Sequence, residues 1–412
     1  MNRVVITGLG AVTPIGNDVP AFWQSMKDSV CGIGPITKFD TAEFKAKVAA
    51  EVKNFDPLCY MPKGEVRKND LFAQYAMGAA SQAVEESGIL GHADPNRIGT
   101  YIGSGIGGIQ TFAAEQENLR VNGPKKVSPF FITKLIGNMA GGIVSIKYRF
   151  RGESLPVTTA CATGNNAIGE AYRAIKHGYL DAAVAGGAEA AIMPLSIAGF
   201  SNMKALSMTE DPKTACLPFD LRRNGFVMGE GAGALMLESY EHALSRGAAI
   251  YGELAGYGVT CDGHHITAPD PTGNGGVRAL EMAYREAMGR ETADPTRIYI
   301  NAHGTSTPQN DRIETGVIKT FFGETAAKKM AVSSTKSMTG HMLGAAGAVE
   351  AVACVMALKE GLIPPTVGYE QPDPDCDLNY VPGVPLKREL DLVLSASLGF
   401  GGHNAYLAFK KL

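Results

Sequence analysis

The chain has 412 residues and a mass of 43.4 kDa, with 45% hydrophobic and 19% charged residues and a formal net charge of −3. This composition excludes an intrinsically disordered chain and gives no electrostatic reason to expect a nucleic acid or an anionic membrane surface as partner. The length predicts about two or three structural units. The 50 glycines follow no fixed period and indicate tight turns and close backbone packing.

The cysteine content and the N-terminal sequence predict a reducing compartment and no targeting peptide. The cysteines number seven, an odd count, and form no Cys-x-x-Cys pair, so neither a disulfide framework nor a cysteine-rich zinc site is expected. The N-terminal MNRVVITGLG lacks the charged and apolar regions of a signal peptide. The longest apolar stretches, such as Ala345–Leu358, are too short to span a bilayer. We expect a cytoplasmic protein that binds neither membrane nor nucleic acid.

The predicted elements of the first half begin with a strand in VVIT near the N-terminus. An amphipathic helix at Leu71–Ser87, the hexapeptide ADPNRI and a strand in IGTYIGS follow. A strand at Leu155–Ala160 then leads through a turn of small residues into a helix at 163–177, which Gly178 closes. Further strands follow, the first of them in AAVAGG.

The second half repeats this order. Residues 293–298 read ADPTRI, at an offset of 200 from ADPNRI at 93–98. A helix at Val277–Met288 precedes the repeat, and a strand in IYINA follows it. A helix at 345–358, closed by Gly361, and final strands in DLVLSAS and NAYLAF complete the plan.

The repeat predicts two related α/β halves, 1–250 and 251–412, with insertions in the first half around 105–150 and 200–230. The strands are continuous apolar or small runs, which is typical of strands buried under helices on both faces. The helices at 163–177 and 345–358 are rich in alanine and glycine, so they can be buried almost all round. We expect two sheets with helices between and outside them, in five layers.

Two short motifs suggest other ligands but fail on context. Residues 103–108 have the Gly-x-Gly-x-x-Gly spacing of a dinucleotide-binding turn, yet no second strand ending in an acidic residue follows about 20 residues later. Residues 261–265 read Cys-x-x-His-His, but no third or fourth metal ligand lies nearby in the sequence. We expect tightly packed turns at the first motif and a polar loop at the second.

Three reactive side chains lie at turns that follow predicted strands. Cys161 precedes a helix, and unpaired N–H groups and the helix dipole there are expected to lower its pKa. His303 and His341 follow strands of the second half. Because equivalent strand ends of two related halves meet near the centre, we expect the three side chains to converge on one pocket.

The motifs around these residues resemble those of β-ketoacyl-acyl carrier protein synthases, most closely the type II elongating enzymes. The resemblance rests on TACATGNNAIGEAYRAI, NAHGTSTPQND, VSSTKSMTGHMLGAAGAVE and LGFGGHNA, and on RVVITGLGAVTPIG and NGFVMGEGAG. It runs along essentially the whole chain and implies the thiolase-like αβαβα sandwich of two pseudo-twofold related halves. It also implies a homodimer that joins an acyl chain to malonyl-acyl carrier protein with loss of CO₂.

The resemblance assigns the chemistry to five residues. Cys161 is the nucleophile that carries the acyl group as a thioester. His303 and His341 donate hydrogen bonds to the malonyl thioester carbonyl. Lys336, together with Glu350, is implied to fix the arrangement of charges in the site. The N–H groups of Cys161 and Phe400 form the oxyanion hole, and Phe400 gates the acyl pocket.

The resemblance also implies supporting and binding residues. Asp311 and Glu314 join Glu350 as structural support. No cofactor is required, because the partner carries the phosphopantetheine arm, and a structural Na⁺ or K⁺ is implied near Asn301, Glu350 and Ser395. Ala396 stands where the family commonly has Asn, which puts that cation shell in doubt. Thr305 and Thr307 are implied to bind the phosphopantetheine arm. Ile106 and Phe200 are implied to line the acyl-chain pocket. Arg67, Lys68 and Lys204 are implied to bind the acidic carrier protein.

Two alternatives stay open at this point. An aromatic polyketide ketosynthase uses the same chemistry with another partner. A non-catalytic subunit of a condensing complex would share the fold without turnover. The presence of both histidines and of Cys161 separates the pattern from thiolases, initiating synthases and chain-length factors.

Overall fold

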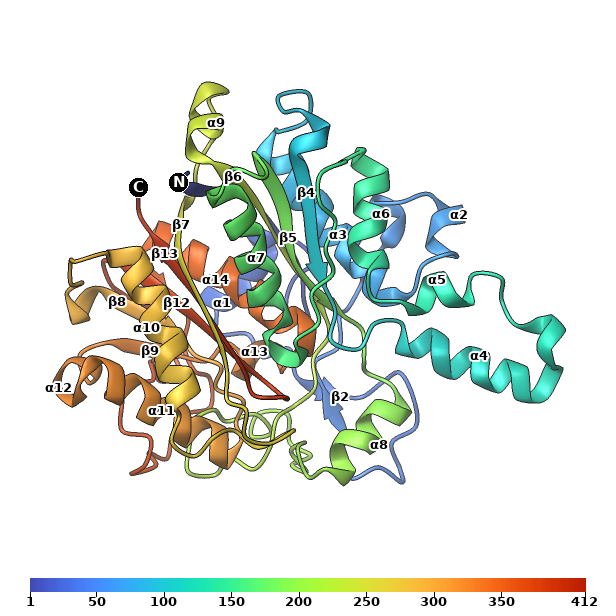
Figure 1. Ribbon diagram of the computed structural model, residues 1–412. Coiled ribbons are helices and arrows are strands. Elements are labelled where there is room, and N and C mark those ends of the chain that lie inside the picture. The colour runs from blue at the N-terminus through green and yellow to red at the C-terminus, as the bar shows by residue number, and fades with distance from the viewer.

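The computed structural model, which describes residues 1–412, contains one large sheet of nine strands (Figure 1). Its strand order is β4-β5-β6-β1-β7-β13-β12-β8-β9. The strands are Val4–Val12 (β1), Ile98–Gly103 (β4), Ala182–Glu189 (β5), Gly231–Ser239 (β6), Gly252–Cys261 (β7), Ile298–Asn301 (β8), Ala331–Ser333 (β9), Leu392–Gly399 (β12) and His403–Lys410 (β13). Two small sheets pair Gly34–Pro35 (β2) with Val48–Ala49 (β3), and Leu362–Ile363 (β10) with Leu386–Lys387 (β11).

The sheet confirms the internal repeat. Strands β4 and β5 are parallel, β5 and β6 antiparallel, and β6 and β1 antiparallel. Strands β8, β12, β13 and β7 repeat these three pairings in the same order and sense. The two halves are joined at their inner edges, because Val4–Ile6 of β1 pairs antiparallel with Gly252–Leu254 of β7. The two expected sheets are therefore one continuous sheet. The boundary predicted at residue 250 falls in the connection just before β7 and stays a prediction.

Two buried helices form the central layer. Helix α7 (Thr163–Lys176) and helix α14 (Ala346–Glu360) pack on each other and on strands of both halves. Every residue from Ala346 to Leu358 is buried, as the alanine-rich pattern predicts. A Cβ on Gly164 would lie 2.4 Å from the backbone N of Ala348, so the two helices can approach this closely only through glycine.

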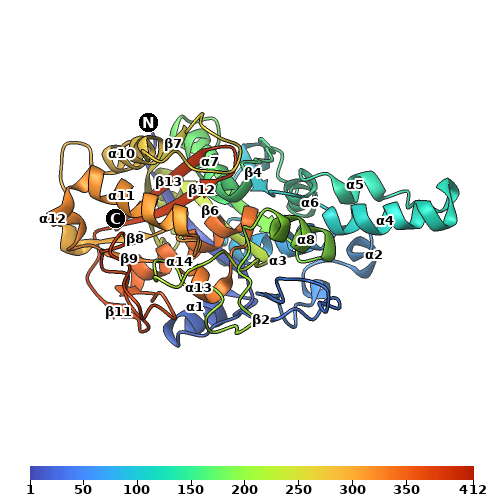
Figure 2. The same cartoon turned by 90° about the horizontal axis from the view of Figure 1, so that it is seen from below.

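Outer helices cover the two remaining faces and complete five layers (Figures 1 and 2). Helices α3 (Leu71–Ser87) and α6 (Met139–Tyr148) cover the first half, and α10 (Asn274–Met288) and α11 (Pro308–Phe322) cover the second. Helix α3 has the predicted bounds because Asp70 caps its first turn and Gly88 ends it with φ 62°. Outside the two insertions, five further helices are Val19–Lys27 (α1), Lys63–Val66 (α2), Tyr240–Ser245 (α9), Glu324–Ala327 (α12) and Lys336–Thr339 (α13).

The two insertions differ in form. The first contains α4 (Ile109–Asn122) and α5 (Phe131–Leu135), which project from the body as an arm in both views (Figures 1 and 2). The second follows α8 (Pro194–Asn202) and contains no helix or strand before β6. Isolated bridges tie it to the body, among them Ala50 with Gly229 and Met228 with His341.

The strand predicted at Leu155–Ala160 is wrong. This segment runs along the open edge of the sheet beside β4, where Thr100 pairs with Ser154 in a single bridge. Backbone bonds join Thr100 to Glu153 and Leu155 only, so the segment has too few partners to form a strand. None of the helices has the length and apolar composition needed to cross a bilayer.

Candidate active site

One cavity of about 470 Å³ brings the predicted reactive residues together. Cys161 comes from the turn before α7, His303 from the loop after β8, and His341 from the turn after α13. Phe400, between β12 and β13, also lines the cavity. The three side chains therefore converge on one cavity as expected, although the segment that leads to Cys161 is not a strand.

Cys161 lies in a tight turn immediately ahead of α7. Residues Ala160–Ala162 form a 3₁₀ turn ahead of α7, and Ala160 has φ 50°, a left-handed conformation that is strained for a residue with a Cβ. Burial raises the pKa of the Cys161 thiol to about 12, although Lys336 and the N–H groups of Phe400 and Cys161 oppose the shift. The expectation of a lowered pKa is wrong, because desolvation exceeds the effect of these donors.

The loop of Phe400 lies beside the Cys161 thiol. Gly401 and Gly402, which follow it, have φ 88° and 78°, so the turn from β12 to β13 uses conformations that favour glycine. The Phe400 ring lies 6.4 Å from the Phe200 ring, measured between centroids. The N–H groups of Phe400 and Cys161 both face the Cys161 sulfur. Two backbone donors therefore meet where an acyl carbonyl on that sulfur would develop charge.

The two histidines form a pair on the opposite wall. Their ring centroids are 5.3 Å apart, edge to face, and the His303 and His341 side chains are almost fully buried. Burial first, and Lys336 second, hold both pKa values well below 6.5, so both rings are neutral at pH 7. Nδ1 of each ring is buried without a hydrogen-bond partner, which leaves Nε2 as the nitrogen able to reach a substrate.

Separate supports fix the backbone at each histidine. Glu314 of α11 accepts hydrogen bonds from the N–H groups of His303 (2.6 Å) and Gly304 (2.8 Å). Burial raises the pKa of Glu314 to about 7, while these two donors favour its ionised form. At the other histidine, His341 N donates to Val227 O (2.7 Å) and Gly229 N donates to His341 O (2.9 Å). The backbone of the NGFVMGEG motif thus holds the backbone of His341 in place.

A buried ion pair lies beside the histidines. Lys336 is fully buried at the start of α13, and its Nζ pairs with Glu350 of α14. Burial raises the pKa of Glu350 to about 7, and Lys336 opposes that shift. The second Glu350 oxygen, Oε2, and Asn301 Oδ1 are both buried without a partner. Two unsatisfied oxygens, with Ser395 nearby on β12, fit the oxygen ligands that a monovalent cation requires.

The predicted binding residues are distributed unevenly. Thr305 and Thr307 line the cavity, and their hydroxyl oxygens are 2.9 Å apart. Phe200 and Lys204 also line it, with Lys204 exposed at its mouth. Ile106 does not line the cavity and is 37% exposed. Arg67 and Lys68 lie away from the cavity near α2, where Lys68 pairs with Glu65 at 2.8 Å.

Glu189, at the end of β5, is a functional candidate that the sequence analysis missed. Its fully buried carboxylate accepts from Ser104 Oγ (2.9 Å), Gly105 N (2.9 Å), Ile106 N (3.2 Å) and Gly344 N (3.0 Å). It therefore joins the loop after β4 to the loop after His341, on either side of Cys161. An acidic residue that ends a strand of small residues was the available signal.

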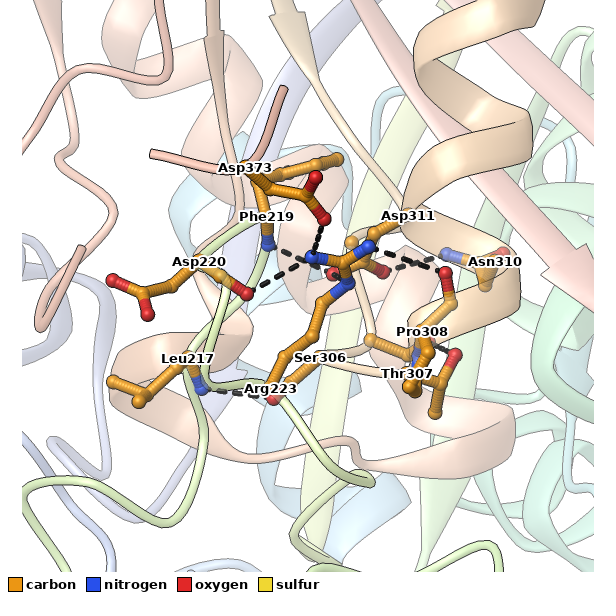
Figure 3. A network of polar contacts seen from close by, with 12 residues as sticks. Leu217, Phe219, Asp220, Arg223, Ser306, Thr307, Pro308, Asn310, Asp311 and Asp373 are labelled. Atoms are coloured by element: carbon orange, nitrogen blue, oxygen red, sulfur yellow. Dashed lines mark hydrogen bonds and ion pairs between the residues drawn. The ribbon is translucent and has the colours of Figure 1, made fainter. Parts of the chain in front are cut away.

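Asp311, one of the residues expected to give structural support, is the centre of a polar network whose other members the sequence analysis missed (Figure 3). Asp311 is fully buried on α11, and its Oδ2 accepts from Phe219 N at 2.8 Å. Arg223 lies against it, with Nε 3.8 Å from Asp311 Oδ2, and pairs with Asp373 at 2.5 Å. The network ties the second insertion to the start of α11, next to the turn that holds Thr305 and Thr307.

The two rejected motifs behave as structural features. A Cβ on Gly103 would lie 2.2 Å from Val157 O, and one on Gly105 would lie 2.7 Å from a Glu189 oxygen. Cys261, His264 and His265 are exposed, and no cluster of three or more His, Cys, Asp or Glu side chains could hold a metal ion. All seven cysteines are free thiols.

Comparison with known proteins identifies the family. The beta-ketoacyl synthase N-terminal domain matches residues 1–243, and the beta-ketoacyl synthase C-terminal domain matches residues 251–370. The chain belongs to the beta-ketoacyl synthase family, which confirms the resemblance drawn from its motifs.

Its relatives agree along the full length. The chain is 49% identical over 412 residues to the 3-oxoacyl-[acyl-carrier-protein] synthase 2 of Synechocystis sp., covering 99% of this chain and 98% of the relative. It is 50% identical over 410 residues to the protein of that name from Staphylococcus aureus, with the same coverage. A beta-ketoacyl synthase structure from Burkholderia phymatum matches with a TM-score of 0.92 at 33% identity, over 100% of both chains.

A further solved structure is a type II PKS acyl-carrier protein in complex with its ketosynthase bound to the hexaketide. It matches with a TM-score of 0.89 at 34% identity, covering 100% of this chain and 99% of that one. These matches confirm the expected thiolase-like α/β fold.

Proposed function

We propose that this protein condenses an enzyme-bound acyl group with malonyl-acyl carrier protein, releasing CO₂ and giving 3-oxoacyl-acyl carrier protein in fatty acid chain elongation. The observation that carries the proposal is a single cavity that joins a thiol, two neutral imidazoles and two backbone N–H donors. Relatives that carry this activity in their name match 99% of the chain at 49% and 50% identity.

In the first half-reaction, Cys161 attacks the acyl thioester and the carrier thiol leaves with a proton. The N–H groups of Cys161 and Phe400 stabilise the oxyanion of the tetrahedral intermediate. Because the resting thiol is protonated at pH 7, its proton must be lost as the sulfur attacks, and Lys336 favours the developing thiolate.

In the second half-reaction, the bond between the malonyl carboxylate and its α-carbon breaks, and CO₂ leaves. The electron pair moves toward the thioester carbonyl, where His303 and His341 stabilise the enolate by donating hydrogen bonds. The α-carbon then attacks the acyl carbon, and the Cys161 sulfur leaves and is protonated. Neutral imidazoles suit this task because each can donate from Nε2 without a change of charge.

Lys336 and Glu350 keep a fixed charge beside the histidines. Burial is the main cause of the lowered pKa values of both histidines, and the charge of the buried lysine adds to it, so both favour neutral rings. A monovalent cation held by Asn301, Glu350 and Ser395 would supply positive charge that compensates the second Glu350 oxygen. Ala396 contributes only its backbone to such a shell.

The partner is an acidic acyl carrier protein, and the setting is the cytoplasm. Lys204 stands at the cavity mouth, and Arg67 and Lys68 offer further positive charge on the surface near α2. Thr305 and Thr307 present hydroxyls to the phosphopantetheine arm inside the cavity. A related ketosynthase is known in complex with its acyl-carrier protein, which supports this choice of partner.

A second copy of the chain covers the arm and the open edge of the first half. Val121 and Ile132 on the arm are 60% and 58% exposed, and Leu155 on the edge segment is 49% exposed. An unpaired edge next to exposed apolar helices favours self-association through a twofold interface. The homodimer is tested by sedimentation of Leu155→Asp and Ile132→Asp, which should release monomers.

The proposed reaction is tested with malonyl-acyl carrier protein and a series of acyl-acyl carrier proteins. Formation of 3-oxoacyl product with CO₂ release by the chain alone supports elongation. Activity that appears only after a second, different ketosynthase-like subunit is added would favour the polyketide alternative. No turnover with any chain length, with Cys161 still alkylated by iodoacetamide, would favour a non-catalytic subunit.

A further inference from the structure

The turn that carries Thr305 and Thr307 has two sides with different surroundings. One side lines the cavity. The other side is held by Ser306, whose Oγ accepts from Leu217 N (2.9 Å) and whose carbonyl accepts from Gly225 N (3.0 Å). The second insertion therefore holds this turn at Ser306 through two hydrogen bonds.

Ser306 shows that the turn is held under strain. It is fully buried and has φ 65°, a left-handed conformation that is unfavourable for a residue with a Cβ. Such a conformation persists only where the surrounding contacts over-determine it. The position of the turn thus depends on the contacts that the insertion supplies.

Arg223 is the side chain that reaches from the insertion to this turn (Figure 3). Its Nη2 donates to Pro308 O at 3.2 Å, and Pro308 is the first residue of α11 and a cavity-lining residue. Its Nη1 donates to Asp373 at 2.5 Å and to Asp220 O at 2.9 Å. The side chain is 5% exposed, so one guanidinium joins three separate segments inside the protein.

We propose that Arg223 is a positioning residue that fixes the Thr305–Pro308 turn against the cavity and so sets where Thr305 and Thr307 meet the pantetheine arm of the substrate. The inference rests on the proposed function, because it takes the two hydroxyls to be pantetheine contacts. The planar guanidinium can donate to the Pro308 carbonyl from one nitrogen and to the Asp373 carboxylate from another at the same time. Lysine keeps the positive charge, but it presents its donors from a single nitrogen. It therefore cannot replace the separate contacts that Nη1 and Nη2 make.

The test compares Arg223→Lys with Arg222→Gln. Arg222 is the matched control, because it is the next residue and pairs with Asp220 and Glu370 but makes no contact with the turn. Each variant is assayed for acyl transfer from an acyl-pantetheine thioester and from acyl-acyl carrier protein. Alkylation of Cys161 by iodoacetamide is measured in parallel, because this small electrophile reaches the nucleophile without using the turn.

We expect Arg223→Lys to lower kcat/KM for both thioesters about 10- to 100-fold, mainly through KM, and to leave alkylation at the wild-type rate. Arg222→Gln should match the wild type in every assay. Wild-type KM in Arg223→Lys would overturn the inference. Equal losses of alkylation and acyl transfer would also overturn it, since they would indicate a general structural role.

Failure of the proposed function gives a different result. In that case the wild-type protein itself forms no acyl-enzyme from either thioester, whatever Arg223 does. If Arg223→Lys does not fold, Thr305→Val and Thr307→Val offer a second route: both keep the turn but remove its hydroxyls. The inference then predicts the same rise in KM with unchanged alkylation, and wild-type KM in both variants would overturn it.

Discussion

The two halves of this molecule share a topology but contribute different chemistry. In the first half, the turn before α7 supplies the thiol that we propose as the nucleophile and one of two backbone donors. In the second half, the equivalent region before α14 supplies His341 and leaves the start of the helix without a reactive group. The proposed acyl-transfer and decarboxylation steps thus draw on side chains from equivalent regions of the two halves.

A buried carboxylate secures the loop after the equivalent strand in each half. Glu189 binds the N–H groups of Gly105 and Ile106 after β4, and Glu314 binds those of His303 and Gly304 after β8. The first comes from the end of a strand and the second from a helix. The comparison teaches that the loops need the same support, although the fold provides it from different elements.

The largest expected effect falls on the first half alone. Cys161→Ser should lower condensation by more than roughly 10⁴-fold, because a hydroxyl is a far weaker nucleophile without a dedicated base. Cys161→Gln should lose condensation as well but keep malonyl decarboxylation, since both histidines remain. Product formation and ¹⁴CO₂ release measured separately check this division. An acyl group found on another cysteine by mass spectrometry would refute it.

The next effect falls on the second half. His303→Ala and His341→Ala should each lower decarboxylation by about 10² to 10³, or about 2.7–4 kcal/mol of transition-state stabilisation. Acyl-enzyme formation should survive better, because it uses the N–H donors of Cys161 and Phe400. Single-turnover acylation and CO₂ release report the two steps. A folded variant with wild-type decarboxylation would remove that histidine from the mechanism.

Alkylation of Cys161 in the first half and decarboxylation by the histidines of the second half should depend differently on pH. With a Cys161 pKa near 12, the thiolate fraction is small and rises about tenfold per pH unit between pH 7 and 9, and so should the alkylation rate. The histidine pKa values lie well below 6.5, so the rings stay neutral and decarboxylation in Cys161→Gln should be flat from pH 8 to 6. A plateau of alkylation near pH 8 would contradict the raised pKa.

The smallest effects sharpen the comparison of the two carboxylates. Glu189→Gln and Glu314→Gln each place an amide donor against backbone N–H groups, and each should reduce turnover about tenfold through misplaced loops. Glu314→Gln should impair decarboxylation more, because His303 moves. Glu189→Gln should impair acylation more and shift Cys161 alkylation to lower pH, because it removes a negative charge that raises the thiol pKa. Equal losses of acylation and decarboxylation in the two variants would show that the two carboxylates do not support different steps.

Much of this arrangement was predictable because it depends on local patterns. The repeat at 93–98 and 293–298, the buried helices and the convergence of Cys161, His303 and His341 all follow from periodicity and strand order. The raised thiol pKa was not predictable, because desolvation depends on side chains from distant segments. The roles of Glu189 and Arg223 were missed for the same reason: Gly344 lies 155 positions from Glu189, and Asp373 lies 150 positions from Arg223.

The central position of β1 has a consequence for how the chain is made. This strand is translated well before its partners in the sheet, which are β6 and β7; Val4 pairs with Ser239 and Leu254. At ordinary synthesis rates of about 5–20 residues per second, β1 waits roughly ten to fifty seconds for its first neighbour to leave the ribosome. This nine-residue strand is buried along its whole length in the folded protein and has Thr7 as its single polar side chain. With both edges open for that time, it is a target for chaperones and a hazard for aggregation. Folding of this protein is therefore expected to be slow and dependent on protection of its first strand.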